Sequence, residues 1–194
     1  MSTLIDSEIA ARCVKGNPKR ANSTPPMIYP FYDHKHEGPP SWGLSSVGYD
    51  VRVGEQWAIY VDREKAIRPD TVEEKDITRK GGNSVILYPG NFILAETMEH
   101  FHMPEDVYAT VHDKSSWIRL GLSVHNTVIE PGWVGVLTLE IKNNNPCIWI
   151  EVKFGDGIAQ VMFHQLGRKP KKGYQGQYQN QRGLSIPGGS EVAR

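Results

Sequence analysis

Cysteine is scarce in this chain of 194 residues: Cys13 and Cys147 are the only two, and they lie 134 positions apart. A pair with this spacing supports neither a disulfide framework nor a zinc site built from cysteines. The chain also lacks an apolar run of the roughly 18 residues that span a membrane, and its first residues have no apolar region like that of a signal peptide. We therefore expect a soluble, cytoplasmic protein with no membrane partner.

An excess of charge of one sign is missing as well, because 22 lysines and arginines balance 22 aspartates and glutamates. Proteins that bind the nucleic-acid backbone usually carry a basic excess, so we expect no nucleic-acid partner. The sequence has no phosphate-binding-loop, dinucleotide-binding, serine-hydrolase or HExxH metalloprotease motif. The HxE and PCxxC motifs of the zinc nucleobase deaminases are also absent, which excludes that zinc chemistry.

Glycine and proline are abundant instead, with 19 and 13 residues, and this composition favours strands and turns over long helices. The length predicts one domain, to which we assign residues 1–166, followed by a polar segment over 167–194 that forms a tail or a lid. Proline is concentrated within 17–45. This stretch is predicted to be a functional loop or an arm that wraps a neighbour.

Hydrophobic spacing predicts one helix and a series of strands. The helix covers 5–15, where Ile5, Ile9 and Cys13 fall near one face and Gly16 marks the end. From Tyr49 onward the period is two, which predicts strands over 49–53, 57–61, 85–88, 92–96, 107–112, 136–142, 148–153 and 158–163. So many short strands predict an all-β barrel or jelly roll.

Glu140 stands in the middle of the predicted strand 136–142. One face of this strand carries Val136, Thr138 and Glu140, and the other carries Leu137, Leu139 and Ile141. A carboxylate in this position is either solvated outside the barrel or buried at a cost in free energy. If it is buried beside a cation such as Arg119, it can act as a positioned general acid and base.

A second candidate is the segment that begins at Lys114. A helical turn starting at Ser115 would aim free backbone N–H groups and the hydroxyls of Ser115 and Ser116 at one point, with Lys114 and Arg119 adding positive charge. This pattern is found in phosphate-binding sites, but taken alone it is more typical of an ordinary helix cap. Glu130, just before Pro131-Gly132, is either a turn residue or a ligand contact.

Metal-binding patterns are weak. His34 and His36, and likewise His100 and His102, have a spacing of two that places both rings on one face of a strand. No third ligand accompanies either pair, so we predict no metal held by the protein itself.

Together these segments resemble the dCTP deaminase family, which is related to the trimeric dUTPases. The resemblance covers most of residues 43–183 and rests on five blocks in the family's order. The blocks are GLSSVGYDVRVG (43–54), LYPGNFILAETME (87–99), KSSWIRLGLSVHNTVIEPGWVGVLTLEI (114–141), GIAQVMF (157–163) and YQNQRG (178–183).

The resemblance implies a dUTPase-like distorted β-barrel with a short internal helix beside the N-terminal one. It implies a homotrimer with active sites at the subunit interfaces, and hydrolysis of the 4-amino group of dCTP to give dUTP and ammonia. The dUTP would supply dUMP for thymidylate synthesis. The family uses no catalytic zinc, and Mg²⁺ accompanies the triphosphate.

The resemblance also implies roles for individual residues. Glu140 occupies the position of the catalytic glutamate, with Ser115 and Arg119 beside the water, phosphate or developing charge. The nucleotide-binding positions are Lys114, Ser115, Ser116, Trp117, Ile118, Arg119, Glu130, Thr138, Leu139, Gln160, Tyr174 and Gln181. Thr138 and Leu139 would act through backbone groups, and Tyr174 and Gln181 belong to a tail that closes over the triphosphate.

The tail departs from the family pattern at two positions, because Gln177 replaces a lysine and Asn180 replaces a glycine. Loss of that cation would weaken triphosphate binding or shift preference toward a less charged nucleotide, unless Lys171 and Lys172 compensate. Three alternatives to simple deamination stay open. They are a bifunctional enzyme that forms dUMP and diphosphate with the help of Glu130, a dUTPase, and a catalytically silent nucleotide-binding regulator.

Overall fold

The computed structural model describes residues 2–14, 25–38, 40–61, 64, 66–125 and 127–188. Helix α1 spans Asp6–Val14, close to the predicted range. Ile9 and Cys13 are buried on the face that the spacing predicts, whereas Ile5 remains exposed. The predicted stop at Gly16 lies outside the described residues.

Strands dominate the rest of the described chain. In order they are β1 (Ser2–Thr3), β2 (Ile28–Tyr29), β3 (Lys35–His36), β4 (Trp42–Leu44), β5 (Tyr49–Tyr60), β6 (Ile77–Gly81), β7 (Ser84–Leu87), β8 (Phe92–His102), β9 (Val107–Asp113), β10 (Leu122–His125), β11 (Val128–Ile129), β12 (Val134–Asn143), β13 (Ile150–Lys153) and β14 (Gly157–Gln165). A 3₁₀ turn, η1, spans Glu74–Asp76, and a short helix, α2, spans Ser115–Ile118.

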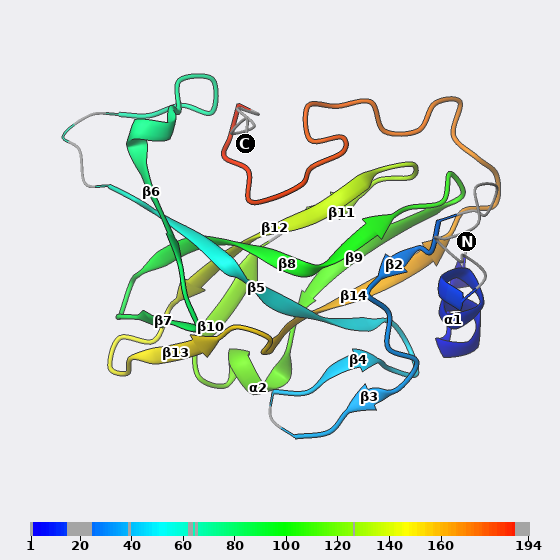
Figure 1. Cartoon of the computed structure of the whole chain (residues 1–194), viewed down its shortest axis with the longest axis horizontal. Helices are drawn as coiled ribbons and strands as arrows, with labels where there is room; N and C mark the ends of the chain where they lie inside the picture. The colour runs from blue at the N-terminus through cyan, green and yellow to red at the C-terminus, as the bar shows by residue number, and fades with distance from the viewer. Residues whose placement is uncertain are drawn as a thin grey trace.

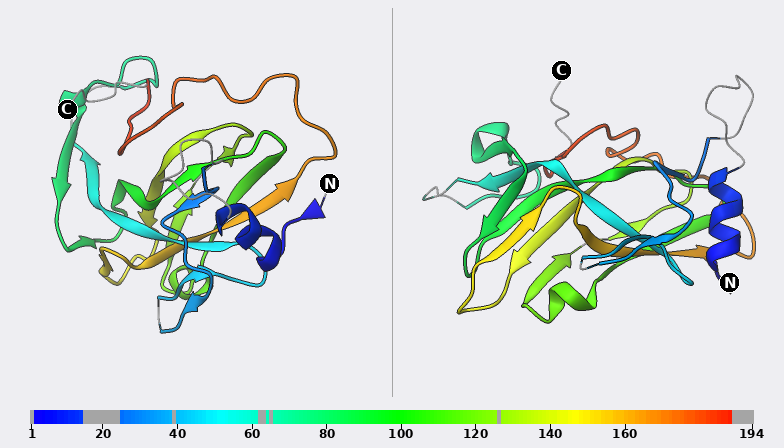
Figure 2. Two further views of the ribbon diagram at one scale, coloured as in Figure 1. Left: turned by 45° about the vertical axis from the view of Figure 1, so that its right-hand side comes forward. Right: turned by 60° about the horizontal axis from the view of Figure 1, so that its bottom comes forward.

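The long strands form one strongly curled sheet in the order β10-β12-β8-β5-β14-β9-β11, and β7 pairs with β13 in a separate ribbon. Neighbouring strands are antiparallel, for example β12 with β8 and β14 with β9. Figures 1 and 2 show how the sheet curls around its own inner face, with α1 at one end and α2 at the lower edge. The predicted β-barrel class with two short helices is therefore confirmed.

Two predicted strands merge in the structure. The ranges 49–53 and 57–61 are parts of β5, which carries an irregularity where Val53 pairs with Thr97 and Trp57 with Ala95. Such a bulge interrupts the period of two, so the sequence reads as two strands rather than one. The strands β6 and β10 were not predicted, and neither were the two- and three-residue strands β1–β4 and β11. β6 has one apolar side chain, Ile77, and β10 has two, Leu122 and Val124, which is too few to mark a strand.

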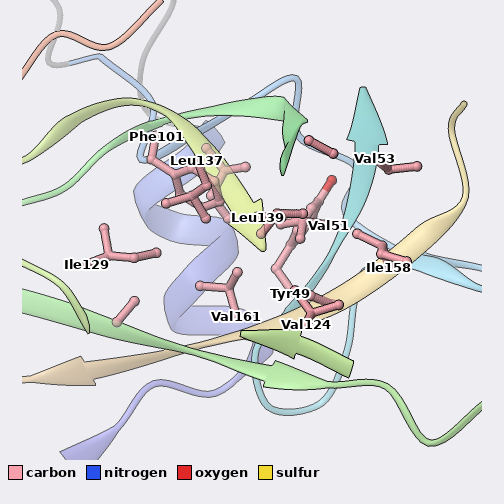
Figure 3. Close-up of a cluster of buried hydrophobic side chains, with 14 of the residues drawn as sticks. Tyr49, Val51, Val53, Phe101, Val124, Ile129, Leu137, Leu139, Ile158 and Val161 are labelled. Carbon is pink, nitrogen blue, oxygen red and sulfur yellow. The ribbon is translucent and has the colours of Figure 1, made fainter. Parts of the chain in front are cut away.

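The core fills the inside of the curled sheet. Tyr49, Phe101 and Phe163 are fully buried, and Leu139 and Ile141 of β12 are equally buried beside them. Figure 3 shows side chains of β5, β12 and β14 converging on this cluster. The alternation along 136–142 therefore points inward as predicted, which leaves Thr138 and Glu140 on the opposite face of β12.

The described part of the proline-rich stretch packs against its own chain. β2 pairs with β8, and β4 pairs with β5. The guanidinium of Arg52 lies 4.8 Å from the ring centre of Tyr32 and 4.4 Å from that of Trp42, and its Nε donates a 2.8 Å hydrogen bond to Glu99. Arg52 and Glu99 are both buried, so this cation–π stack anchors the stretch on the sheet.

The segment after β14 crosses the outside of the sheet. In Figure 1 it runs above β11 and β12 in orange and red and ends near β6. Within the described part of the chain, no helix is long and apolar enough to cross a membrane.

Candidate active site

The carboxyl group of Glu140 lies half-buried on the face of β12 that points away from the main core. Removal from water disfavours the charged form, and this burial raises the pKa of Glu140 to about 7. Tyr60 of β5 lies nearby, and its pKa is raised by burial first and by the charge of Glu140 second. A carboxyl group with this pKa can both accept and donate a proton near neutral pH.

Glu140 lines a cavity of about 500 Å³. Its walls come from β5, β8, β11, β12 and the tail. The predicted site residues in its lining are Glu130, Thr138, Glu140, Tyr174 and Gln181, and the lining also includes Tyr60, Phe92, Trp133 and Tyr178. The structure therefore brings the glutamate and the predicted tail residues to one place.

Hydrogen bonds hold the tail against the β11–β12 turn. The indole Nε1 of Trp133 donates a 2.8 Å hydrogen bond to the carbonyl of Tyr178. The amide of Gln179 donates to the Gly132 carbonyl at 2.8 Å, and its oxygen accepts from the Val134 N–H at 2.9 Å. Asn180 has a φ of 63°, a left-handed conformation that glycine adopts freely and that asparagine tolerates better than most residues. The structure thus explains how asparagine can stand at this glycine position.

A second hollow, of about 630 Å³, lies at the start of α2. The predicted site residues in its lining are Lys114, Ser115, Ser116 and Gln160. The helix begins at Ser115 as predicted, and the side chains of Ser115 and Ser116 are exposed at its first turn. The side chains of Ser115 and Ser116 are therefore accessible to an anion at the start of this helix.

Lys114 is buried rather than exposed in this hollow. Its ammonium forms an ion pair with Asp50, which is itself 1% exposed, and lies 3.3 Å from Ser41 Oγ. Lys35 of β3 reaches the same Asp50 oxygen at 3.0 Å. The charge of Lys114 is therefore paired with that of Asp50. Lys35, with 44% of its side chain exposed, is the more accessible cation of the two.

The remaining predicted residues line neither cavity. Arg119 and Ile118 are exposed, whereas the Trp117 side chain is buried and donates a 2.8 Å hydrogen bond to the Gly157 carbonyl. Leu139 is fully buried in the core, which leaves only its backbone for contact with a ligand. Within one chain, the structure therefore does not place Arg119 and Ser115 in the cavity of Glu140.

Sequence reasoning missed Tyr60, Lys35 and Asp50. Asp50 lies within the block GLSSVGYDVRVG. A charged residue among the apolar residues at the start of a predicted strand could have indicated a buried ion pair. Lys35 and Tyr60 lie outside the blocks, and their contacts with Asp50 and Glu140 join distant parts of the chain. No local pattern marks such residues.

The histidine pairs remain separate from both cavities. His36 stacks on Trp42 with ring centres 4.7 Å apart, and exposed His34 lies 2.9 Å from Asp33. His100 and His102 are half-buried on β8, and burial together with the charge of His102 lowers the pKa of His100. Among the residues that the structure describes, no group of three or more histidine, cysteine, aspartate or glutamate side chains could hold a metal ion.

Comparison with known proteins gives a consistent family. The family model described as dCTP deaminase-like matches residues 29–166. A protein named dCTP deaminase from Wolbachia sp. subsp. Brugia malayi is 38% identical over 83% of this chain and 89% of its own. Another of that name, from Acidobacterium capsulatum, is 37% identical over 83% of this chain and 90% of its own.

The fold is similar to that of a solved structure. The crystal structure of 2'-deoxycytidine 5'-triphosphate deaminase from Agrobacterium tumefaciens superposes with a TM-score of 0.59 at 20% identity. The match covers 84% of this chain and 47% of that one, so this chain spans about half the length of the solved chain.

Proposed function

The chain belongs to the dCTP deaminase-like family, and we propose that it hydrolyses the 4-amino group of dCTP to give dUTP and ammonia. The observation that carries this proposal is the placement of Glu140. Its carboxyl group lines a cavity between the sheet and the tail, with a pKa raised to about 7 by burial. The proposal makes the protein an enzyme of nucleotide metabolism.

Glu140 performs the proton transfers of this reaction. Its carboxylate takes a proton from the attacking water and passes that proton to N3 of cytosine, while the water oxygen bonds to C4. The second proton of the water then moves to the departing amino group, which leaves as ammonia as the C4 carbonyl forms. A single group with a pKa near the working pH suits both directions of transfer.

The tail and the first turn of α2 bind the rest of the nucleotide. Tyr174 and Gln181 line the Glu140 cavity, and we assign them to closure over the triphosphate. Ser115, Ser116 and Gln160 line the second hollow, where exposed hydroxyls and helix N–H groups favour an anion. We assign Lys114 to holding that turn in place, because its ammonium is buried against Asp50.

We further propose a homotrimer in which each active site uses two subunits. Glu140 with the tail would come from one subunit, and the segment from Lys114 to Arg119 with Gln160 from its neighbour. The separation of these residues into two cavities within one chain supports this arrangement. A symmetric assembly brings two different patches of the same chain together at each interface.

Mg²⁺ belongs to the substrate in this proposal. The carboxylates of Glu130 and Glu140 face one cavity, and no larger ligand cluster occurs among the described residues. Mg²⁺ commonly binds through one or two carboxylates plus substrate phosphates, so this sparse ligand set fits an ion that arrives on the triphosphate. We propose no bound zinc.

The test is to incubate the purified protein with dCTP and Mg²⁺ and to separate the products by anion-exchange chromatography. We expect dUTP and an equal amount of ammonia. A dUMP peak with diphosphate would favour the bifunctional alternative, because Glu130 lines the same cavity and would serve to orient a second water. No turnover of dCTP, with dUTP hydrolysed instead, would contradict the proposal and indicate a dUTPase.

A further inference from the structure

The end of the described tail, residues 181–187, is defined here as the strap and forms part of the wall of the Glu140 cavity. Gln181, Ser185, Ile186 and Pro187 line that cavity together with Glu140. Figures 1 and 2 show the strap, in red, lying near β6 and the segment before it. Residues 62–82 lie between the first two of the five sequence blocks described above, and the function proposed above assigns them no role.

We propose that Arg79 of β6 is a positioning residue that holds the strap closed over the nucleotide. The inference rests on the proposed function, because it takes the Glu140 cavity as the place where the nucleotide is bound. Three sets of contacts carry it.

The first set is hydrophobic. Leu184 and Ile186 of the strap are 7% and 1% exposed, and they pack into a small cluster with Ala58 of β5, Ile77 of β6 and Leu94 of β8. This cluster is separate from the main core. A tail with so few apolar residues thus has a defined docking point, and β6 forms one side of it.

The second set is polar and centres on Arg79. Its Nη1 donates a 2.9 Å hydrogen bond to the carbonyl of Leu184. Its Nε and Nη2 donate to the two carboxylate oxygens of Glu74 at 3.1 and 2.7 Å. The fork of Arg79 on Glu74 fixes the plane of the guanidinium, so the third donor points at the strap; a lysine cannot make all three contacts.

The third set connects the strap to the catalytic strand. The side-chain amide of Gln181 and the N–H of Ser185 both donate to Thr138 Oγ1, at 2.7 and 3.0 Å. Thr138 precedes Glu140 by two residues, so their side chains share one face of β12. Arg79 and Thr138 bind the neighbouring strap residues Leu184 and Ser185, so together they set the position of the strap relative to Glu140.

The expected consequence of losing Arg79 is a strap that opens more often. Because the strap closes over bound nucleotide, its contacts contribute to binding more than to the proton transfers. We expect Arg79→Met to raise KM for dCTP about tenfold while kcat falls less than threefold. Arg79→Lys should give an intermediate KM, because lysine keeps a charge but not the fork.

The test combines these kinetics with limited trypsin digestion in the absence of nucleotide, followed by mass spectrometry. Arg182 is an exposed trypsin site within the strap, and Lys171 and Lys172 are exposed sites outside it. In Arg79→Met we expect cleavage after Arg182 to accelerate about tenfold, with cleavage after Lys171 and Lys172 unchanged. The matched control is Arg68→Met, because Arg68 is 76% exposed and pairs only locally with Asp70.

Unchanged cleavage after Arg182 would overturn the proposal, and so would faster cleavage with an unchanged KM. If Arg79→Met does not fold, Leu184→Ala tests the same docking point from the side of the strap and is expected to show the same two effects. The digestion does not depend on catalysis. Faster cleavage in a protein that fails to convert dCTP would therefore support the Arg79–strap contact and contradict the proposed function.

Discussion

The side-chain amide of Gln181 donates a 2.7 Å hydrogen bond to the hydroxyl of Thr138. This contact joins the tail to the strand that carries Glu140, across 43 residues of sequence. Glycine at position 135 permits the close approach, because a Cβ there would lie 2.8 Å from the Gln181 carbonyl oxygen. The pocket around Glu140 is therefore built jointly by the sheet and the tail, and the predictions below separate the contributions of each.

Glu140→Gln is expected to abolish ammonia release while the affinity for dCTP changes by less than about tenfold. Glutamine keeps the shape of the side chain but cannot accept and return a proton, so the loss falls on kcat. Ammonia release is measured with a coupled assay, and dCTP binding by calorimetry. Retained turnover would remove Glu140 from the mechanism.

The pH dependence of kcat/KM should follow Glu140. Burial raises the pKa of this carboxyl group to about 7, and the base form is needed to take the proton from water. We therefore expect kcat/KM to rise about tenfold per pH unit below this value and to level off above it. A profile that is flat between pH 5 and pH 8 would contradict this assignment.

The same pKa shift makes a prediction about stability. The folded protein binds the Glu140 proton more tightly than the unfolded chain, whose value is 4.5. Glu140 therefore makes its full contribution to the free energy of unfolding below pH 4.5. This contribution is lost as the pH rises to about 7. We therefore expect the Tm of Glu140→Gln, relative to that of the native protein, to be higher at pH 8 than at pH 4.5. The difference corresponds to at most about 3 kcal/mol in the free energy of unfolding.

Truncation after Leu166 removes the whole tail. It removes Tyr174 and Gln181 from the Glu140 cavity and uncovers the cluster around Leu94. We expect KM for dCTP to rise by more than tenfold, which steady-state kinetics will show. Circular dichroism of the truncated chain provides the control for folding, and unchanged kinetics would show that the tail has no part in binding.

A mixing experiment tests the two-subunit site. Glu140→Gln and Arg119→Ala chains, each inactive alone, are coexpressed with different tags, and the mixed oligomer is purified. If each site takes Glu140 from one subunit and Arg119 from its neighbour, one of the three interfaces in every mixed trimer combines the two intact residues, so about a third of the sites are intact. Activity near that level is expected in the mixture, whereas a mixture as inactive as its parents would place both residues within one chain.

The buried pair of Lys114 and Asp50 should be a major determinant of stability. The Lys114 side chain is only 8% exposed, and in Asp50→Ala its ammonium loses its carboxylate partner. Removing one partner of a buried ion pair typically costs about 3–5 kcal/mol. Asp33→Ala is the matched control, because its pair with His34 is exposed and worth at most about 1 kcal/mol. Urea unfolding at a fixed protein concentration measures both, and equal losses would contradict the prediction.

Much of the fold could be predicted from the sequence, because it depends on local periodicity. The alternation of Leu137, Leu139 and Ile141 identifies the buried face of β12, and the spacing of Ile9 and Cys13 identifies that of α1. The strand β6 could not be found in this way. Its importance comes from Arg79, whose contact with the Leu184 carbonyl spans 105 residues and leaves no periodic trace.

The sequence by itself determined the class of fold, the family and the identity of Glu140 as the candidate base, since these follow from strand periodicity and from short ordered blocks. Only the tertiary structure decided that Glu140 and Ser115 line different cavities of one chain, and that Lys114 is held by Asp50 rather than offered to a ligand. The physical reason is distance along the chain. Local pattern fixes which way a side chain points, whereas burial and charge pairing depend on which remote segment folds against it.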